Sequence, residues 1–164
     1  VLNVFRMFSR MGRQRVAVES DAAVPLDAIT RRGVREQPDV SALASRGPHE
    51  LSVLVWHYHD DDVPGPDAAV TLTVAGLPCD DGEARLTHFR IDEDHSNAFA
   101  AWRRAGSPPN PTPGQYTALV QAGQLTAFGP PGTVRFTNGA LSLAFTLPRQ
   151  GLSLLLLEWG ATPK

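Results

Sequence analysis

Two short runs in the chain are apolar on both faces when they are drawn as β-strands. The first is Leu51–His59 (LSVLVWHYH), and the second is Leu152–Trp159 (LSLLLLEW), which comes close to the end of the chain. Successive side chains of a strand point to opposite faces, so a strand of this kind must be covered on both sides. The two runs therefore predict central strands of a sheet that lies inside a layered β structure.

Shorter alternating segments surround these two runs. Val70–Val74 places Val70, Leu72 and Val74 on one inward face, and residues 84–91 form a further strand pattern. Residues 133–137 and 140–147 flank Asn138-Gly139, the pair of residues most typical of a two-residue β-hairpin turn. About seven strands separated by turn residues predict a mainly β fold, an antiparallel β-sandwich.

The strand pattern is interrupted by two predicted helices at about residues 96–125. Ser96 or Asn97 can cap a helix over 98–105, which Gly106 ends. Thr112-Pro113-Gly114-Gln115 has the form of a capping box with proline at its first helical position. We expect a two-helix insertion here. Residues 21–39 show no clear period and are interpreted as a linker or a long surface loop.

The first twelve residues predict an amphipathic helix without an N-cap. A helical period places Val1, Val4, Phe5, Phe8 and Met11 on one stripe, with arginines outside it and Gly12 after the helix. A helix of about eleven residues is marginally stable alone, so its apolar face must rest against another body. We expect that body to precede Val1, which makes the chain part of something longer.

Composition excludes several classes of function. The chain has 164 residues, too few for a (β/α)₈ barrel, and a formal net charge of −2, which offers no electrostatic footprint for nucleic acid. Its single cysteine, Cys79, allows no internal disulfide. No run is long and apolar enough to span a membrane, and no signal peptide is recognisable.

Three polar clusters are candidates for chemical sites. His57, His59 and Asp61 share one strand face at metal-ligand spacing, but a satisfied surface pair is the better interpretation. Asp60–Asp62 is read as a solvated turn rather than a Ca²⁺ loop. Asp92–Asp94 is read as a set of loop acids that order the following helix, because three adjacent acids do not form a glycosidase cleft.

Other catalytic and binding patterns are weak or missing. The sequence contains no Gly-x-Ser-x-Gly elbow and no glycine-rich phosphate loop. Four aromatic residues could form a platform that stacks on sugars, but their spacing favours packing in the core. They are Trp56, Tyr58, Trp102 and Tyr116.

Three segments resemble the C-terminal part of glycoside hydrolase family 39, with bacterial β-xylosidases as the best match and α-L-iduronidases as more distant relatives. They are Val1–Phe8 (VLNVFRMF), Leu51–Asp60 (LSVLVWHYHD) and Arg90–Asn97 (RIDEDHSN), the last followed by Trp102 and Gly106-Ser107-Pro108. The resemblance covers nearly the whole chain, and its third segment is the most specific.

The resemblance implies that residues 1–12 are the last helix of a catalytic (β/α)₈ barrel and that residues 13–164 are the accessory β-sandwich. Enzymes of the family hydrolyse glycosides with retention, and both catalytic glutamates belong to the barrel. The chain itself then carries no catalytic residue and needs no metal or cofactor. The parent would be a xylan 1,4-β-xylosidase acting on xylo-oligosaccharides, in the bacterial cytoplasm or periplasm.

The resemblance also implies where this chain meets the missing barrel. We expect Val4, Phe5, Phe8 and Met11 to face the barrel from the first helix. Residues that interrupt the sandwich are placed at the interface or the rim of the active site, namely Asp92, Asp94, His95, Asn97 and Trp102. Three alternatives stay open: an insertion folded only on the sandwich, a stand-alone carbohydrate-binding module, and a module for homo-oligomerisation.

Overall fold

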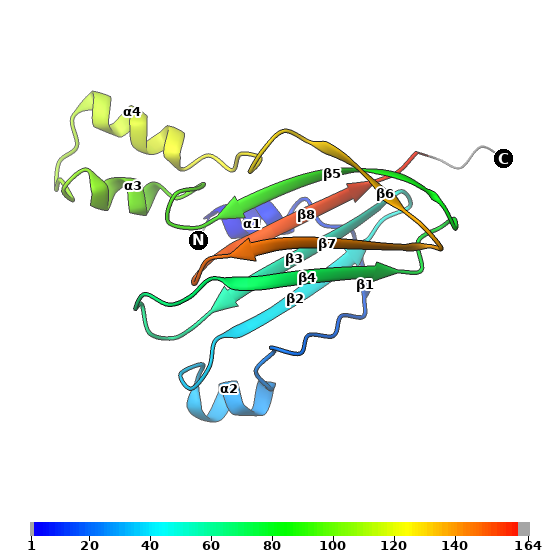
Figure 1. Ribbon diagram of the computed structural model, residues 1–164. Helices are drawn as coiled ribbons and strands as arrows, with labels where there is room; N and C mark the ends of the chain where they lie inside the picture. The colour runs from blue at the N-terminus through cyan, green and yellow to red at the C-terminus, as the bar shows by residue number, and fades with distance from the viewer. Residues whose placement is uncertain (1, 161–164) are drawn as a thin grey trace.

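The computed structural model describes residues 2–160, which form two antiparallel sheets and four helices (Figure 1). The larger sheet has the order β1-β2-β3-β8-β5-β6, and the smaller sheet contains only β4 and β7. The strands are β1 (Gln14–Val16), β2 (Asp39–Arg46), β3 (Glu50–Tyr58), β4 (Ala68–Ala75), β5 (Gly82–Ile91), β6 (Gly132–Phe136), β7 (Ala140–Leu147) and β8 (Leu152–Glu158). The predicted β-sandwich is confirmed.

The two strands that are apolar on both faces lie side by side in the middle of the larger sheet. β3 pairs with β8 from Glu50 opposite Glu158 to Trp56 opposite Leu152. On one face, Val53 and Leu155 pack against the smaller sheet in the main core. On the other face, Leu54 and Leu154 belong to a second core cluster. The larger sheet is therefore buried on both sides at its centre, as the sequence predicts.

The second core cluster is closed by the first helix, α1 (Leu2–Phe8). Met7 is 0% exposed and packs with Leu54, Phe89 and Leu154, so it is the residue that seats the helix on the sheet. Met11, just after the helix, packs against the same cluster.

The apolar residues predicted to share one face of α1 therefore point in two directions, some toward solvent and some toward the sheet. Phe5 and Phe8 are exposed, as expected for residues that face away from the sandwich, but Met11 contacts the sheet and Val4 is half-buried. Val1 lies outside the described residues. A regular helix through residue 11 would place Met11 on the stripe, but α1 ends at Phe8 and the chain then turns toward Gly12. A Cβ on Gly12 would collide with the carbonyl group of Arg46, so glycine permits this close approach to β2.

The expected hairpin at Asn138-Gly139 is wrong in its pairing. Both residues have positive φ angles, 51° and 64°, which suit a type I′ turn. However, β6 pairs with β5 in the larger sheet, whereas β7 pairs with β4 in the smaller one. The only pairing across this turn within residues 2–160 is the isolated bridge between Thr137 and Ala140. The turn is local, while burial of Leu141 and Leu147 between the sheets decides where β7 runs.

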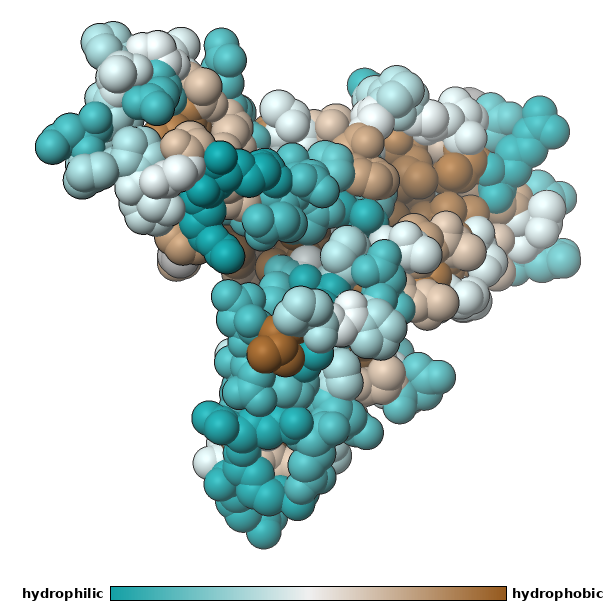
Figure 2. All heavy atoms as spheres, turned by 60° about the vertical axis from the view of Figure 1, so that its left-hand side comes forward, coloured by the Kyte–Doolittle hydropathy of each residue, from teal (hydrophilic) through white to brown (hydrophobic). Residues whose placement is uncertain are grey.

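Residues 21–39 contain a helix, α2 (Leu26–Arg32), that the sequence analysis did not anticipate. None of its residues is buried, so it has no apolar periodicity to reveal it. It forms the hydrophilic lobe at the bottom of Figure 2. Within residues 2–160, no helix has the length and apolar character needed to cross a membrane.

The two-helix insertion is confirmed with its caps. α3 (Ala98–Arg104) is capped by Asn97, whose side chain accepts a hydrogen bond from the Ala100 amide. α4 (Pro113–Ala122) begins with the complete capping box of Thr112 and Gln115. The two helices form a hairpin that projects from one end of the sandwich (Figure 1).

Truncating the buried contact of α1 should reveal which face holds it. We expect Met7→Ala to lower the free energy of unfolding by about 2–5 kcal/mol, because it opens a cavity against Leu54 and Leu154. The matched variant Phe5→Ala removes a side chain that is 65% exposed and should change the value by less than about 0.5 kcal/mol. Urea unfolding of both variants measures the difference, and equal losses would contradict this packing.

Candidate functional site

The loop that joins β5 to α3 is organised around the carboxylate of Asp92. This residue is buried, and its Oδ1 atom accepts hydrogen bonds from the backbone amides of Asp94 at 2.9 Å and His95 at 2.8 Å. The same oxygen lies 2.7 Å from Nδ1 of His95. Because an ionised carboxylate can only accept, His95 donates through Nδ1 to Asp92. The loop is thus closed by its own first acidic residue.

Asn97 connects this loop to the helix that follows. Its Nδ2 atom donates to the carbonyl of Asp92 at 2.9 Å, and its Oδ1 atom accepts from the Ala100 amide at 3.1 Å. The side chain of His95 is 44% exposed, and its Nε2 atom makes no hydrogen bond within residues 2–160. Asp92 and Asn97 are therefore satisfied inside the loop, whereas His95 presents one free ring nitrogen at the surface.

Of the other two predicted site residues, Asp94 lies in the loop before α3 and Trp102 lies on α3. Asp94 is on the surface, where it forms an ion pair with Arg104 at 2.7 Å. Trp102 donates through Nε1 to the carbonyl of Pro108 and stacks on Phe99, with ring centroids 5.7 Å apart. The structure brings Asp92, His95 and Asn97 together, and it assigns Asp94 and Trp102 to contacts within the insertion.

α1 is fastened to the base of the insertion by two polar residues that the sequence analysis missed. Asn3 is buried and donates to the carbonyls of Ser96 at 2.6 Å and Gly123 at 3.1 Å. Arg6 donates to the Asn3 side chain and also to Gly123. A buried asparagine in a short apolar helix was the available signal, since such a side chain needs partners.

Exposed apolar side chains gather on the first helix and on the insertion. On α1, Leu2 is 64% and Phe5 65% exposed, and Phe8 is exposed as well. On the insertion, Phe99 and Tyr116 are exposed to a similar degree. Asn3 ties α1 to both ends of the insertion, so the two sets of exposed side chains lie on adjoining elements. Clusters of this kind mark interaction surfaces more often than isolated exposed residues do.

Behind the loop, a buried polar cluster joins the two sheets. Arg90 donates to Ser153 Oγ on β8 and to the carbonyl of Thr146 on β7, and its guanidinium lies 4.1 Å from the centre of the Phe128 ring. His88 Nε2 lies 2.8 Å from the same Ser153 hydroxyl. Burial, and to a smaller extent the positive charge of Arg90, lower the pKa of His88 to about 4. His88 is therefore neutral at pH 7.

The prediction that His57 and His59 form a surface pair is wrong, because both side chains are buried and each contacts a backbone carbonyl. His57 Nδ1 lies 2.9 Å from the carbonyl of Leu147, and His59 Nε2 lies 2.9 Å from the carbonyl of Arg35. The backbone amide of Asp61 donates to the remaining nitrogen of His59. Among residues 2–160, no group of three or more potential ligand side chains is placed to hold a metal ion.

The expectation that four aromatic residues are core residues is wrong for two of them. Trp56 and Trp102 are partly buried and hydrogen-bonded, Trp56 to Asp39. Tyr58 and Tyr116 are exposed. Tyr58 lies at the end of its strand, beyond the cover of α1, and α4 has no buried residue because it packs on little besides α3.

No family model matches this sequence, and no curated protein matches it. The fold is nevertheless shared with solved glycosidase structures. The bacterial orthologue of human α-L-iduronidase aligns with 99% of this chain at a TM-score of 0.75 and 22% identity. A monomeric β-xylosidase from Caulobacter crescentus CB15 aligns with 97% at a TM-score of 0.68 and 15% identity. The family 39 enzyme from Xanthomonas axonopodis pv. citri aligns with 71% at a TM-score of 0.62 and 21% identity.

The chain spans less than a third of each of these proteins. It covers 27% of the iduronidase orthologue, 30% of the Caulobacter enzyme and 25% of the Xanthomonas enzyme. The similarity therefore establishes that this sandwich fold occurs as a part of larger glycoside hydrolase family 39 proteins.

Removing the carboxylate at the centre of the loop should destabilise the chain. We expect Asp92→Ala to lower the free energy of unfolding by about 1–3 kcal/mol, because the amides of Asp94 and His95 lose their acceptor. The control Asp94→Ala breaks only an exposed ion pair and should cost less than about 0.5 kcal/mol. Denaturant unfolding at pH 7 compares them, and a neutral Asp92→Ala variant would contradict this role.

The neutral state of His88 should make stability depend on pH. Its pKa is lower in the folded chain, about 4, than in the unfolded chain, about 6.5, so the unfolded state binds the extra proton first. Stability from this residue is complete above pH 6.5 and is lost as the pH falls toward 4. Unfolding measured between pH 7 and pH 4 should decline less steeply in His88→Gln than in the unsubstituted chain; parallel curves would refute this assignment.

Proposed function

We propose that residues 13–164 are the accessory β-sandwich of a retaining glycoside hydrolase of family 39, a xylan 1,4-β-xylosidase. In this proposal residues 1–12 are the last helix of the catalytic barrel, and the rest of the barrel lies outside the 164 residues. In this proposal the chain alone hydrolyses nothing. Three observations support it: the resemblance of the Arg90–Asn97 segment, the fold shared with parts of family 39 enzymes, and the exposed apolar flank of α1.

The exposed apolar flank of α1 is the observation that most strongly supports this proposal. The helix is held from one side by Met7 and Asn3, while Leu2, Phe5 and Phe8 remain exposed on the other. A seven-residue helix has little stability of its own, and leaving three large apolar side chains in water forgoes about 25 cal/mol per Å². A second folded unit that covers the flank would explain both the stability of this short helix and the apolar side chains on its outer side. The rest of the barrel is that unit in our proposal.

The loop around Asp92 would supply polar contacts beside this apolar flank. Asp92 and Asn97 fix the loop without any partner, so the loop keeps its shape before docking. His95 is held by Asp92 through one ring nitrogen and offers the other at the surface. An oriented and partly exposed hydrogen-bonding group of this kind suits the rim of an interface. We propose that His95 bonds to the barrel.

The chemistry proposed for the parent protein belongs to its barrel. One carboxylic acid donates a proton to the leaving oxygen of a xylo-oligosaccharide, and a second carboxylate attacks the anomeric carbon to form a glycosyl-enzyme. The first residue, now a carboxylate, takes a proton from water as that water attacks the same carbon and displaces the second carboxylate. Xylose is released with its configuration retained, and the acid is restored. The sandwich takes no part in bond breaking and acts by holding the barrel's last helix in place.

The direct test compares the chain alone with the longer polypeptide that carries it behind its barrel. We expect the longer polypeptide to hydrolyse 4-nitrophenyl β-xyloside, and the chain alone to be inactive. In the longer polypeptide, Phe5→Asp should lower the melting temperature by several degrees, because it places a charge in the interface. In the chain alone the same variant should be neutral, since Phe5 is exposed there.

Leu26→Asp is the matched control, because Leu26 is 75% exposed on the hydrophilic α2 lobe, away from the proposed interface. It should leave the melting temperature unchanged in both proteins. Equal effects of the two variants in the longer polypeptide would refute the docking surface. Hydrolysis of an α-L-iduronide in place of the β-xyloside would keep the accessory role and overturn the proposed substrate.

A further inference from the structure

The smaller sheet ends in a strand with one unpaired edge. β4 pairs with β7 along its whole length, from Ala68 opposite Leu147 to Ala75 opposite Ala140, but its other edge pairs with no strand within residues 2–160. The strand AAVTLTVA contains no charged residue, no proline and no glycine. Natural edge strands normally carry such residues to prevent further pairing, so β4 lacks the usual protection.

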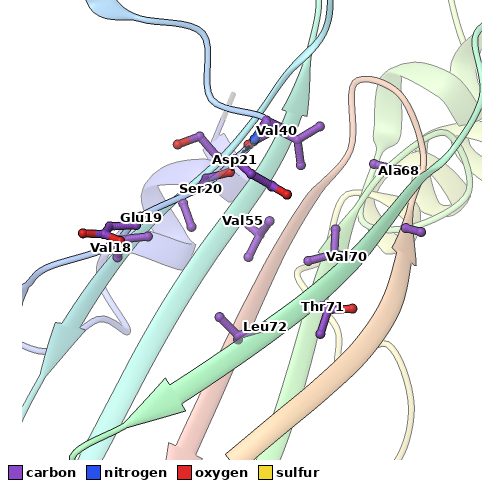
Figure 3. Close-up of a pocket in the computed structure, with 14 residues that line it drawn as sticks. Val18, Glu19, Ser20, Asp21, Val40, Val55, Ala68, Val70, Thr71 and Leu72 are labelled. Atoms are coloured by element: carbon purple, nitrogen blue, oxygen red, sulfur yellow. Dashed lines mark hydrogen bonds between the residues drawn. The ribbon is translucent and has the colours of Figure 1, made fainter.

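A groove runs beside this unpaired edge, between the two sheets. One end of it, of about 570 Å³, is lined by Val40, Ala42 and Val55 of the larger sheet and by Val70 and Leu72 of β4 (Figure 3). The other end, of about 770 Å³, continues toward Ala75. The two ends share four lining residues, Val18, Glu19, Thr71 and Leu72, so they form one groove along β4.

The groove exists because the larger sheet extends beyond the smaller one. β2 and the segment that follows β1 lie under the space next to β4, where the smaller sheet has no strand. The small side chains of Ala42 and Ala44 on β2 form part of this floor, and Val70 and Leu72 are only partly buried in consequence. The side chains that β2 and β3 contribute to the floor are mostly apolar, while Glu19 and Asp21 line the side opposite β4. The side formed by β4 has backbone groups that pair with no strand within residues 2–160.

Symmetric pairing of this edge with a second copy of the chain would bring the larger sheets of the two copies together. Two β4 strands paired antiparallel are related by a two-fold axis perpendicular to the sheet. Both six-stranded sheets would then lie on the same side, and each would project β1 and β2 past the axis into the other. A single added strand that carries no large sheet of its own would avoid this overlap.

We propose that β4 receives one extended strand from the part of the same polypeptide that lies outside the 164 residues. This inference rests on the proposed function, because the solved proteins that share the fold have about three-quarters of their length outside it. The added strand extends the smaller sheet to three strands and covers β2. Its backbone pairs with β4, and its inward residues, at alternate positions, are apolar to match Ala42 and Leu72.

Hydrogen exchange of the backbone amides tests this directly. In the 164-residue chain, the β4 amides that point to the free edge should exchange quickly, and those that point to β7 slowly. In the longer polypeptide we expect the fast set to slow by at least about a hundredfold. Fast exchange at this edge in both proteins would overturn the inference.

The same experiment separates this inference from the proposed function. Slower exchange in α1 and in the Asp92–Asn97 loop reports docking of the barrel, whereas slower exchange in β4 reports the added strand. Slowing in α1 alone would refute the strand and keep the accessory role; slowing in β4 alone would keep the strand and refute the docking surface.

A substitution in the floor of the groove provides a second test. Ala42→Trp fills the groove with a large ring and should restore fast exchange at the β4 edge of the longer polypeptide, while α1 stays protected. Ser142→Trp is the control, because Ser142 is exposed on the outer face of β7 and should leave β4 protected. Protection of β4 that survives Ala42→Trp in a folded protein would contradict a strand seated over β2.

Discussion

The structure depends on the burial of β3 and β8 on both faces. Their apolar side chains alternate between the two sides of the larger sheet, so the sheet needs one cover for Val53 and Leu155 and another for Leu54 and Leu154. The smaller sheet supplies the first cover, and α1 supplies the second through Met7. Neither cover is complete: α1 has an apolar outer flank, and the smaller sheet leaves β2 uncovered. In our proposals, a part of the polypeptide outside these residues covers each gap.

Polar residues fix how the pieces around the sheet are joined. Asn3 locks α1 to the two ends of the insertion, Asp92 and Asn97 shape the loop between β5 and α3, and Arg90 connects the two sheets. Each of these side chains is hydrogen-bonded to backbone groups, which makes the arrangement specific in a way that apolar burial alone does not.

The sequence was sufficient to predict the features that depend on local chemistry. The caps at Asn97 and Thr112, the central positions of β3 and β8, and the inward face of Val70 and Leu72 all follow from residue type and spacing. The course of β7 did not, because Asn138-Gly139 makes the same turn whether the flanking strands pair or separate into two sheets. The helix α2 carries no buried residue and so left no periodic signal. The loop residues were found through a family resemblance, whereas their mutual hydrogen bonds required the fold.

The central claim is that the outer flank of α1 rests against a body outside these 164 residues. A benzophenone amino acid in place of Phe5, introduced into the longer polypeptide and activated by light, tests this contact at a single position. We predict that mass spectrometry will find the cross-link on a residue of the barrel, outside the 164 residues. A cross-link confined to the sandwich itself, or to a second copy of the chain, would contradict the account.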